Sequence, residues 1–395
     1  MPIGRSPRQP RARAAFFAAA IGLATVLAGP ALAATPSDGD ANRSSAPFRG
    51  LVELTEYQRF QLAHLPWSGD PDPARLKQLR DAWTAMTVHD DETARAMVQK
   101  DAEAGDANAQ FLLAAVLLDA LGPNEHYADA EALLKKASDQ GQPTAAFWLG
   151  RIRADGMYGR PVDKAEALYW YRMADALGHP EAGAQICWIY DQGTGVQRDV
   201  RQSLIYCQRA AERGSSWAMD RLGYMYSWGI AVPRDQQKAF DWVMKAAVTG
   251  YPLAERNIAL RYLHGSGTPP DAVEAMQWLS RAADQGDAQA FVELGIIYRD
   301  GLTGTVDLPK AAMWFNIAAG KGNAAGRYEY AAALEGGRGV NKDLVQAYLN
   351  YSQAALQGYA KAEGALARLK VALNSDELDR ATRLADAARS RKPNE

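Results

Sequence analysis

The fold is decided by the stretch AFVELGIIYRDGLTGTVDLPKAAMWFNIAAGKGNAA, which spans residues 290–325. The unit at 218–253 reads AMDRLGYMYSWGIAVPRDQQKAFDWVMKAAVTGYPL and holds similar residue types at the same offsets. Such units begin at residues 109, 145, 182, 218, 254, 290, 326 and 362, so the period is 36 residues with one interval of 37. A fixed period of this length predicts a repeat array, in which each unit packs on its neighbours instead of around one central core.

Each unit is predicted to form two helices joined by a glycine-rich turn. The first helix carries Leu294, Gly295 and Tyr298, and its glycine lets a second helix approach closely. The second helix carries small residues and one large aromatic residue on a single stripe. In several units an Asp precedes it as an N-terminal cap (Asp163, Asp199, Asp235, Asp307 and Asp343). We therefore predict an all-α protein, a solenoid of stacked helix pairs.

The pattern A-x-x-x-L-G-x-x-Y-x-x-G-x-G-V-x-x-D-x-x-K-A-x-x-W-x-x-K-A-A-x-x-G resembles the Sel1-like repeat, a relative of the tetratricopeptide repeat. The resemblance covers residues 109–361 as seven units. It implies a right-handed α-solenoid of helix-turn-helix repeats with helical caps. Some units depart from the pattern. The second has Arg153 in place of the usual Tyr and one inserted residue near Arg160.

An export signal is predicted at the N-terminus. Four arginines between Arg5 and Arg13 precede an apolar stretch over 14–27, and Ala31-Leu32-Ala33 follows as a small-x-small motif. This is the layout of a secretory signal peptide over residues 1–33, cleaved near Ala33-Ala34. The alternative is an uncleaved membrane anchor, which the short apolar stretch disfavours. We expect a periplasmic or secreted protein that has no stable membrane insertion after cleavage.

Between the signal and the array the sequence predicts a linker and a cap. Residues 34–47 are expected to be a disordered linker. Residues 48–108 are expected to form an N-terminal helical cap, with helices over 51–65 and 74–86. The cap ends in an unpaired second helix over 91–105, because its residues match the repeat offsets.

A second helical cap is predicted over residues 362–389. Asn374 and Glu377 have the spacing of a capping box, which opens a charged helix. Residues 390–395 are expected to be a disordered tail.

The charge of the chain restricts its partners. The net charge is −2, and the four arginines of residues 1–33 contribute +4 to it, so the remainder is mildly acidic. A nucleic-acid partner would need clustered Lys and Arg to neutralise phosphates, and an anionic membrane surface would need the same. We therefore expect a protein or peptide partner, no nucleic acid, and a monomer.

A search for catalytic motifs favours a protein that is not an enzyme. The sequence has no Ser-x-x-Lys, no Gly-x-Ser-x-Gly, no P-loop and no His-Glu-x-x-His. Its five histidines do not pair at the spacing of metal ligands. We expect no catalytic residue, no metal and no cofactor. The alternative is a cell-wall or β-lactam hydrolase, because a cysteine-rich bacterial branch of the resembled family has been linked to β-lactam binding.

The two cysteines lie in one unit. Cys187 takes the glycine position of a first helix, and Cys207 lies on the second helix directly after the aromatic Tyr206. These positions should face each other within the helix pair, and an oxidising compartment permits a bond. We predict a Cys187–Cys207 disulfide in preference to two buried thiols.

The partner is expected to bind the concave face, which first helices line in solenoids of this kind. By analogy with tetratricopeptide arrays, the third, seventh and eleventh positions of each unit face it. The selected residues are Arg151, Trp188, Asp220, Tyr224, Trp228, Arg256 and His264. Aromatic residues and Arg are enriched in binding hot spots, although Trp188 and Tyr224 could instead belong to the core between repeats.

Members of the resembled family act as adaptors. The resemblance therefore implies a non-enzymatic scaffold or adaptor of the bacterial cell envelope. The alternative within this class is a periplasmic regulator of a membrane sensor, a signalling system or an exopolysaccharide system.

Overall fold

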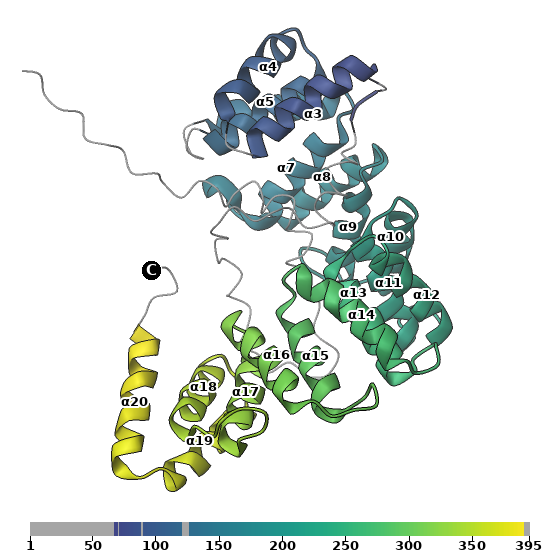
Figure 1. Cartoon of the computed structure of the whole chain (residues 1–395). Coiled ribbons are helices and arrows are strands. Elements are labelled where there is room, and N and C mark those ends of the chain that lie inside the picture. Colours follow the sequence, from purple (N-terminus) through teal and green to yellow (C-terminus); the bar gives the residue numbers. More distant parts are fainter. Residues whose placement is uncertain (1–66, 70, 88–89, 121–125, 391–395) are drawn as a thin grey trace, which may run out of the picture. The chain divides into compact units, whose positions relative to one another are not determined.

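A computed structural model of the chain describes residues 67–69, 71–87, 90–120 and 126–390. The expected signal peptide, the linker, the helix over 51–65 and most of the tail lie outside the described residues. Every regular element among the described residues is a helix (Figure 1). The fold is therefore all-α, as the sequence predicts.

The chain divides into two compact units, Met1–Arg234 and Asp235–Glu395. The described helices of unit 1 are α3 (Pro73–Thr87), α4 (Asp91–Glu103), α5 (Ala107–Ala120), α6 (Tyr127–Asp139), α7 (Pro143–Asp155), the 3₁₀ helix η1 (Met157–Gly159), α8 (Lys164–Ala176), α9 (Pro180–Gln192), α10 (Val200–Glu212) and α11 (Ser216–Trp228). Those of unit 2 are α12 (Gln236–Ala247), α13 (Pro252–His264), α14 (Ala272–Asp284), α15 (Ala288–Asp300), α16 (Leu308–Gly320), α17 (Ala324–Gly336), α18 (Leu344–Leu356), α19 (Lys361–Ala372) and α20 (Ser375–Ser390).

Consecutive helices pack as hairpins within each unit. The pairs α5/α6, α7/α8 and α9/α10 pack together in unit 1, and α13/α14, α15/α16 and α17/α18 do so in unit 2. Each second helix also packs against the first helix that follows it, as α6 does against α7 and α14 against α15. This succession, which Figure 1 follows along its colour ramp, is an α-solenoid arrangement.

Local caps set the limits of the helices. The carboxylate of Asp307 accepts a hydrogen bond from the backbone N–H of Lys310 at 3.0 Å and so begins α16. At the start of α20, Asn374 Oδ1 accepts from the Glu377 N–H at 2.9 Å, and Glu377 Oε2 accepts from the Asn374 N–H at 3.1 Å. The predicted capping box is confirmed, and a capping box of this kind satisfies two backbone donors at a helix start.

The repeated glycine of the first helix has the packing reason that the sequence predicts. A Cβ placed on Gly295 would lie 2.4 Å from Cε1 of Phe315 on α16, which is closer than real Cβ atoms come. The two helices of this hairpin therefore meet at a distance that only glycine permits. The buried alanines of α16, Ala311 and Ala318, allow the same close approach from the other side.

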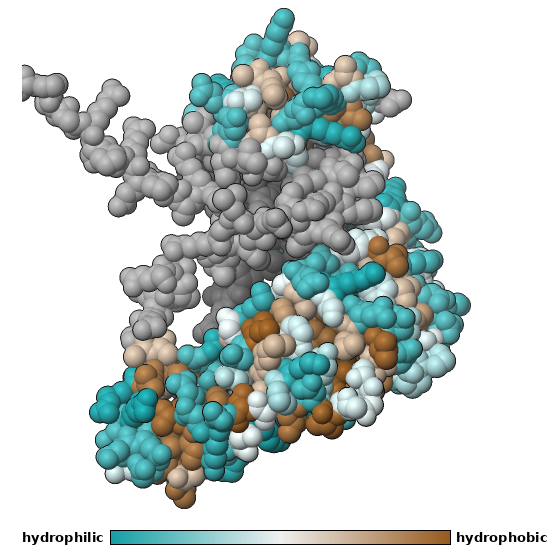
Figure 2. Space-filling model, viewed as in Figure 1, coloured by the Kyte–Doolittle hydropathy of each residue, from teal (hydrophilic) through white to brown (hydrophobic). Residues whose placement is uncertain are grey.

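Each unit has its own buried core, made of apolar residues of successive helices. One cluster in unit 1 extends from α3 to α9, and two clusters in unit 2 cover α13 to α17 and α17 to α20. On the visible face of the molecule, hydrophobic spots lie scattered among polar residues (Figure 2).

The inserted residue of the second repeat forms an irregular turn. Helix α7 is followed by η1, in which Tyr158 has a left-handed backbone with φ of 56°. The Arg160 guanidinium lies over the Tyr127 ring, 4.2 Å from its centroid. The insertion is therefore absorbed in the turn, so that α8 still begins at its Asp163 cap.

Ala231 gives a prediction about stability. It stands where other units have the second glycine of their turn and has φ of 58°, which costs an L-residue about 1 kcal/mol. Ala231→Gly should therefore raise the free energy of unfolding of unit 1 by roughly 0.5–1 kcal/mol. Chemical denaturation followed by circular dichroism measures the change. Ala184→Gly, in the interior of α9, should destabilise instead, and stabilisation by both variants would contradict the backbone explanation.

Candidate partner-binding surfaces

The residues selected from the sequence all lie on first helices. In unit 1 they are carried by α7, α9 and α11 (Arg151, Trp188, Asp220, Tyr224 and Trp228). Arg256 and His264 lie on α13 of unit 2. The selected residues are therefore divided between the two units.

Helix α11 carries the most exposed aromatic pair of the set. Tyr224 and Trp228 are four residues apart, and their ring centroids lie 6.4 Å from each other at an interplanar angle of 48°. The side chain of Trp228 is 58% exposed, and that of Tyr224 is partly buried. Large aromatic side chains normally give up most of their accessible surface in a folded chain. Their exposure here makes this pair the strongest candidate for a partner contact in unit 1.

Arg221 completes this cluster, and the sequence analysis missed it. Its guanidinium lies over the Tyr224 ring, 4.5 Å from the centroid. The same group pairs with Asp191, whose side chain is almost fully buried at the end of α9. The ion pair holds Arg221 in place on the ring, so that a cation and two aromatic rings form one surface on α11. The spacing of Arg221 and Tyr224, three residues apart on a helix, was the available signal.

Three of the other selected residues make internal contacts, and a fourth, Asp220, is partly buried on α11. Arg151 pairs with Asp155 one turn further along α7, at 3.3 Å. Trp188 is partly buried and packs against the core of unit 1, which is the alternative that the sequence left open. Arg256 pairs with Asp287 at 3.0 Å, with both side chains largely buried. His264 is exposed at the last position of α13.

The cysteines pair as predicted. A disulfide joins Cys187 on α9 to Cys207 on α10, and both residues are fully buried. The Ser203 hydroxyl donates a hydrogen bond to Cys187 Sγ, with the atoms 3.2 Å apart. The bond ties together the two helices of the hairpin that carries Trp188 and Asp191. Its burial identifies it as a structural bond, because a redox-active cysteine needs access to solvent.

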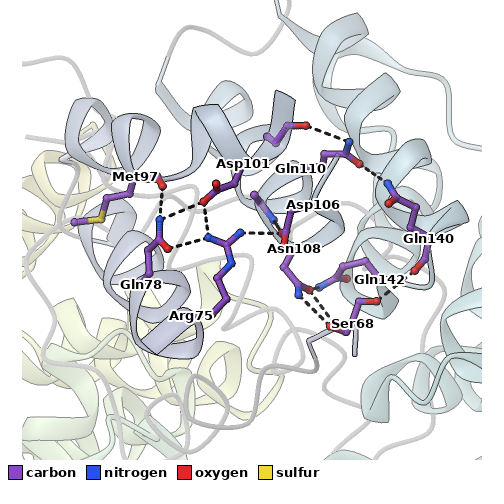
Figure 3. Close-up of polar contacts among 12 residues, drawn as sticks. Ser68, Arg75, Gln78, Met97, Asp101, Asp106, Asn108, Gln110, Gln140 and Gln142 are labelled. Carbon is purple, nitrogen blue, oxygen red and sulfur yellow. Dashed lines mark hydrogen bonds and ion pairs between the residues drawn. The ribbon is translucent and has the colours of Figure 1, made fainter. Parts of the chain in front are cut away.

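A largely buried polar network links α3, α4, α5 and the start of α7, and it was not predicted (Figure 3). Arg75 on α3 pairs with Asp101 on α4 and, at 3.0 Å, with Asp106 at the start of α5. Gln78 donates to the carbonyl of Met97 at 2.8 Å, which adds a further link between α3 and α4. These contacts join the cap to the first full repeat.

In the same network, the side-chain amide of Asn108 holds the backbone of Ser68, which lies in a bend. Asn108 Oδ1 accepts a hydrogen bond from the Ser68 backbone N–H at 2.8 Å, and Asn108 Nδ2 donates to the Ser68 carbonyl at 3.1 Å. Gln142 Nε2 also donates to Asn108 Oδ1, at 3.5 Å. Figure 3 shows Ser68 between Asn108 and Gln140. One carboxamide therefore binds both hydrogen-bonding groups of a residue that lies 40 positions earlier in the chain.

His179 is buried between repeats. Its ring stacks on Phe147 with centroids 4.2 Å apart and an interplanar angle of 10°, and it is 5% exposed. Burial lowers the pKa of the His179 imidazole to about 3. The contact joins α7 to the N-cap residue of α9, 32 residues apart in the chain.

A pH dependence of stability follows from this burial. At pH values between about 3 and 6.5 the unfolded His179 binds a proton that the folded side chain does not, so the free energy of unfolding falls as the pH is lowered through this window. The expected loss between pH 6.5 and 5 is about 2 kcal/mol. Denaturation of unit 1 at several pH values measures it, and His179→Leu should flatten the profile. His264→Leu is the control, because that exposed side chain remains in water when the chain folds. An equal slope in the wild type and His179→Leu would contradict the prediction.

Among the described residues, no helix is long and apolar enough to cross a membrane. No group of three or more His, Cys, Asp and Glu side chains within the described ranges could hold a metal ion. The candidate surfaces are therefore built from aromatic rings, guanidinium groups and side-chain amides. Such groups recognise other polypeptides through stacking and hydrogen bonds.

The fold defines a solenoid repeat protein built of successive helix hairpins, with Trp228 exposed on the first helix α11. A family model for the Sel1 repeat matches residues 107–142, 143–179, 180–215, 218–247, 252–287, 289–323 and 324–359. The chain belongs to the Sel1-repeat family. Proteins of this family are generally scaffolds for protein interactions.

Two solved structures resemble the chain. One is c5321, described as a protective antigen present in uropathogenic Escherichia coli strains and displaying an SLR fold. It is 31% identical, with a TM-score of 0.62, over 80% of this chain and 69% of that one. The other is a Sel1 repeat protein from Oxalobacter formigenes, 26% identical with a TM-score of 0.50, over 58% of this chain and 92% of that one.

A curated relative also matches part of the array. It is the chitin synthase regulator SKT5 of Saccharomyces cerevisiae, 27% identical over 136 residues. The match spans 34% of this chain and 18% of that protein. The chain thus spans less than a fifth of the length of this relative, and the likeness concerns the repeats.

Proposed function

We propose that this protein is a non-enzymatic scaffold of the bacterial cell envelope that binds a protein partner on the face of its first helices. The observation that carries the proposal is the half-exposed Tyr224–Trp228 pair on α11, with Arg221 stacked beside it. Trp, Tyr and Arg dominate binding hot spots because they bury large areas at a low cost in conformational entropy. Trp188, Arg151 and Asp220, on first helices of the same unit, would add weaker contacts.

An exported location supports the envelope assignment. A buried disulfide forms and persists in oxidising compartments such as the periplasm, and it is rare in the bacterial cytosol. The arginine-rich and apolar sequence of residues 1–33 agrees with export. Within this class, a regulator that binds the periplasmic domain of a membrane sensor or of an exopolysaccharide system is one form that the adaptor could take.

The double variant Tyr224→Ala/Trp228→Ala tests the surface. We expect it to reduce capture of the partner at least tenfold, because it removes both aromatic rings of the cluster. The measurement is crosslinking in intact envelopes, followed by pull-down and quantitative mass spectrometry against the wild type. Tyr169→Ala is the matched control, since Tyr169 is 56% exposed but lies on the second helix α8.

Two outcomes would contradict the proposed function. Undiminished capture of every partner by the double variant, with its circular dichroism spectrum intact, would reject the α11 surface. Turnover of a β-lactam or of cell-wall fragments by the purified wild type would reject the non-enzymatic assignment and support the hydrolase alternative.

A further inference from the structure

In unit 1, a residue of the first repeat binds the backbone of an earlier segment of the same chain. Asn108 is the second residue of α5, and its carboxamide binds the N–H and the carbonyl of Ser68 at 2.8 and 3.1 Å. Gln142, the N-cap residue of α7, donates to the same Asn108 oxygen. We call this pair of carboxamides, Asn108 with Gln142, the amide clamp of unit 1. A clamp of this kind reads the backbone and does not depend on the side chain that it holds.

The same pair of chemical groups recurs in unit 2 at equivalent positions. Gln289 is the second residue of α15, and Asn323 is the N-cap residue of α17. Asn323 Nδ2 donates to Gln289 Oε1 at 3.1 Å, just as Gln142 donates to Asn108. Two carboxamides therefore lie across adjacent repeats in the same geometric relation in both units.

The hydrogen-bonding capacity of Gln289 matches what Asn108 uses. A carboxamide has two acceptor sites on its oxygen and two N–H donors. The oxygen of Gln289 accepts from Asn323, and its nitrogen donates to Glu293 Oε1 at 2.9 Å. One acceptor site and one N–H donor of Gln289 therefore remain. Asn108 uses the same two kinds of group to bind the Ser68 backbone.

Burial separates the two clamps. Asn108 is 6% exposed and Gln142 is fully buried, and Trp67, next to Ser68 in the chain, packs against the core of unit 1. Gln289 and Asn323 are both partly exposed. The surface that the chain covers with its own backbone in unit 1 is thus accessible at the equivalent place in unit 2.

The space beside the clamp accommodates a small side chain. In unit 1, Gly141 lies next to Ser68, and a Cβ placed on Gly141 would lie 3.8 Å from Ser68 Oγ. Gly322 takes the equivalent place in unit 2, with nothing within 4 Å of its own ideal Cβ position. A residue with a small side chain, such as Ser, would fit there.

We propose that Gln289 and Asn323 form a second amide clamp, which binds a peptide segment of a partner protein through its backbone, with a small residue at the clamp. The clamp would bind the N–H and the carbonyl of that residue. The proposal does not depend on the α11 cluster, because the two sites use different residues of different units. The clamp would recognise the backbone of a partner. The α11 cluster, in contrast, would contact a partner through its own aromatic side chains.

The experiment uses a fluorescent peptide, Ala-His-Leu-Pro-Trp-Ser-Gly-Asp-Pro-Asp, with the sequence of residues 63–72. Fluorescence polarisation measures its binding to the purified full chain. Gln289→Leu should weaken binding at least tenfold, whereas Gln277→Leu, the same change at an exposed position of α14, should leave it unaltered. Thermal unfolding of both variants checks that unit 2 remains folded.

Two changes in the peptide separate backbone recognition from side-chain recognition. Methylation of the Ser amide nitrogen removes the N–H that the clamp needs, and it should weaken binding at least tenfold. Exchange of the same Ser for Ala retains the backbone and should change the affinity less than threefold. A larger loss of affinity on exchange of Ser for Ala than on methylation of its amide nitrogen would overturn the proposal.

The site of binding is mapped with a photoreactive benzoylphenylalanine in place of the peptide Trp. Crosslinks to residues 286–325 support the second clamp. Crosslinks confined to residues 104–144 would show that the peptide replaces the chain's own segment at the unit 1 clamp. That result would overturn the proposal. Concentration-dependent dimerisation that Gln289→Leu abolishes would instead assign the site to a second copy of this chain and overturn the assignment to a partner protein.

Discussion

Replacement of Cys187 and Cys207 together by alanine is expected to lower the free energy of unfolding of unit 1 by about 3 kcal/mol. The bond joins α9 to α10 across 20 residues of sequence, and in the unfolded chain it removes the entropy of that loop. Both sulfur atoms are fully buried, so the double variant also leaves a small cavity in the hairpin. Chemical denaturation of the oxidised wild type and the variant measures the difference.

The wild type under strong reduction provides the control. Unfolding and refolding it with a reducing agent should lower the midpoint toward that of the double variant, because the loop is then unconstrained in both. Each single variant, Cys187→Ala or Cys207→Ala, should behave like the double variant. Equal stability of the oxidised wild type and the double variant would contradict the structural role of the bond.

The substitution Gly267→Ala should destabilise unit 2 by about 3 kcal/mol. Gly267 lies in the turn after α13 with φ of 80°, a backbone conformation that costs an alanine about 1 kcal/mol. The added Cβ would also lie 2.1 Å from the carbonyl oxygen of Gln236, which begins the second helix of the preceding repeat. Since that oxygen belongs to the backbone, relief requires the two repeats to separate, at a further cost of about 1–3 kcal/mol.

A matched glycine separates the two contributions. Gly286 has φ of 90°, but nothing lies within 4 Å of its ideal Cβ position. Gly286→Ala should therefore cost only the backbone part, about 1 kcal/mol. Urea denaturation measures the free energy of unfolding of both variants. An equal loss of stability in the two would show that the contact with Gln236 does not constrain the spacing of the repeats at Gly267.

The close fit at Gly267 also explains why a glycine recurs at this position of the turn. The glycine recurs at 195, 267 and 339, and at each place an added Cβ would meet the first residue of the preceding second helix within 2.4 Å. At Ala231 the chain departs from this pattern and keeps the left-handed backbone without glycine. The sequence pattern thus records a contact between repeats, although it does not show with which residue.

Local features could be predicted because their partners lie a few residues away. The Asp caps of the second helices bond to backbone N–H groups two or three residues later, and Asn374 bonds to Glu377 in the same way. The cysteine pair could be predicted as well, because the period fixed which faces of one hairpin meet. These contacts follow from helix geometry, which the spacing of residues encodes.

Contacts between repeats could not be predicted in the same way. Whether Arg256 faces a partner or pairs with Asp287, 31 residues later, depends on how one repeat is rotated against the next. The ion pair of Arg221 with Asp191, 30 residues earlier, also depends on that rotation. A rotation of a few degrees per repeat leaves the sequence period unchanged, so the rotation cannot be predicted from the period.

The sequence by itself determined the class of this protein: an array of helix pairs with a 36-residue period, its caps and its disulfide. The tertiary structure decided which side chains remain exposed for contact. It buried Arg256 in an ion pair, left Trp228 and Tyr224 on the surface with Arg221 beside them, and covered one amide clamp while the other stays accessible. The physical reason is that helix formation depends on neighbours along the chain, whereas exposure depends on residues that are distant in sequence and close in space.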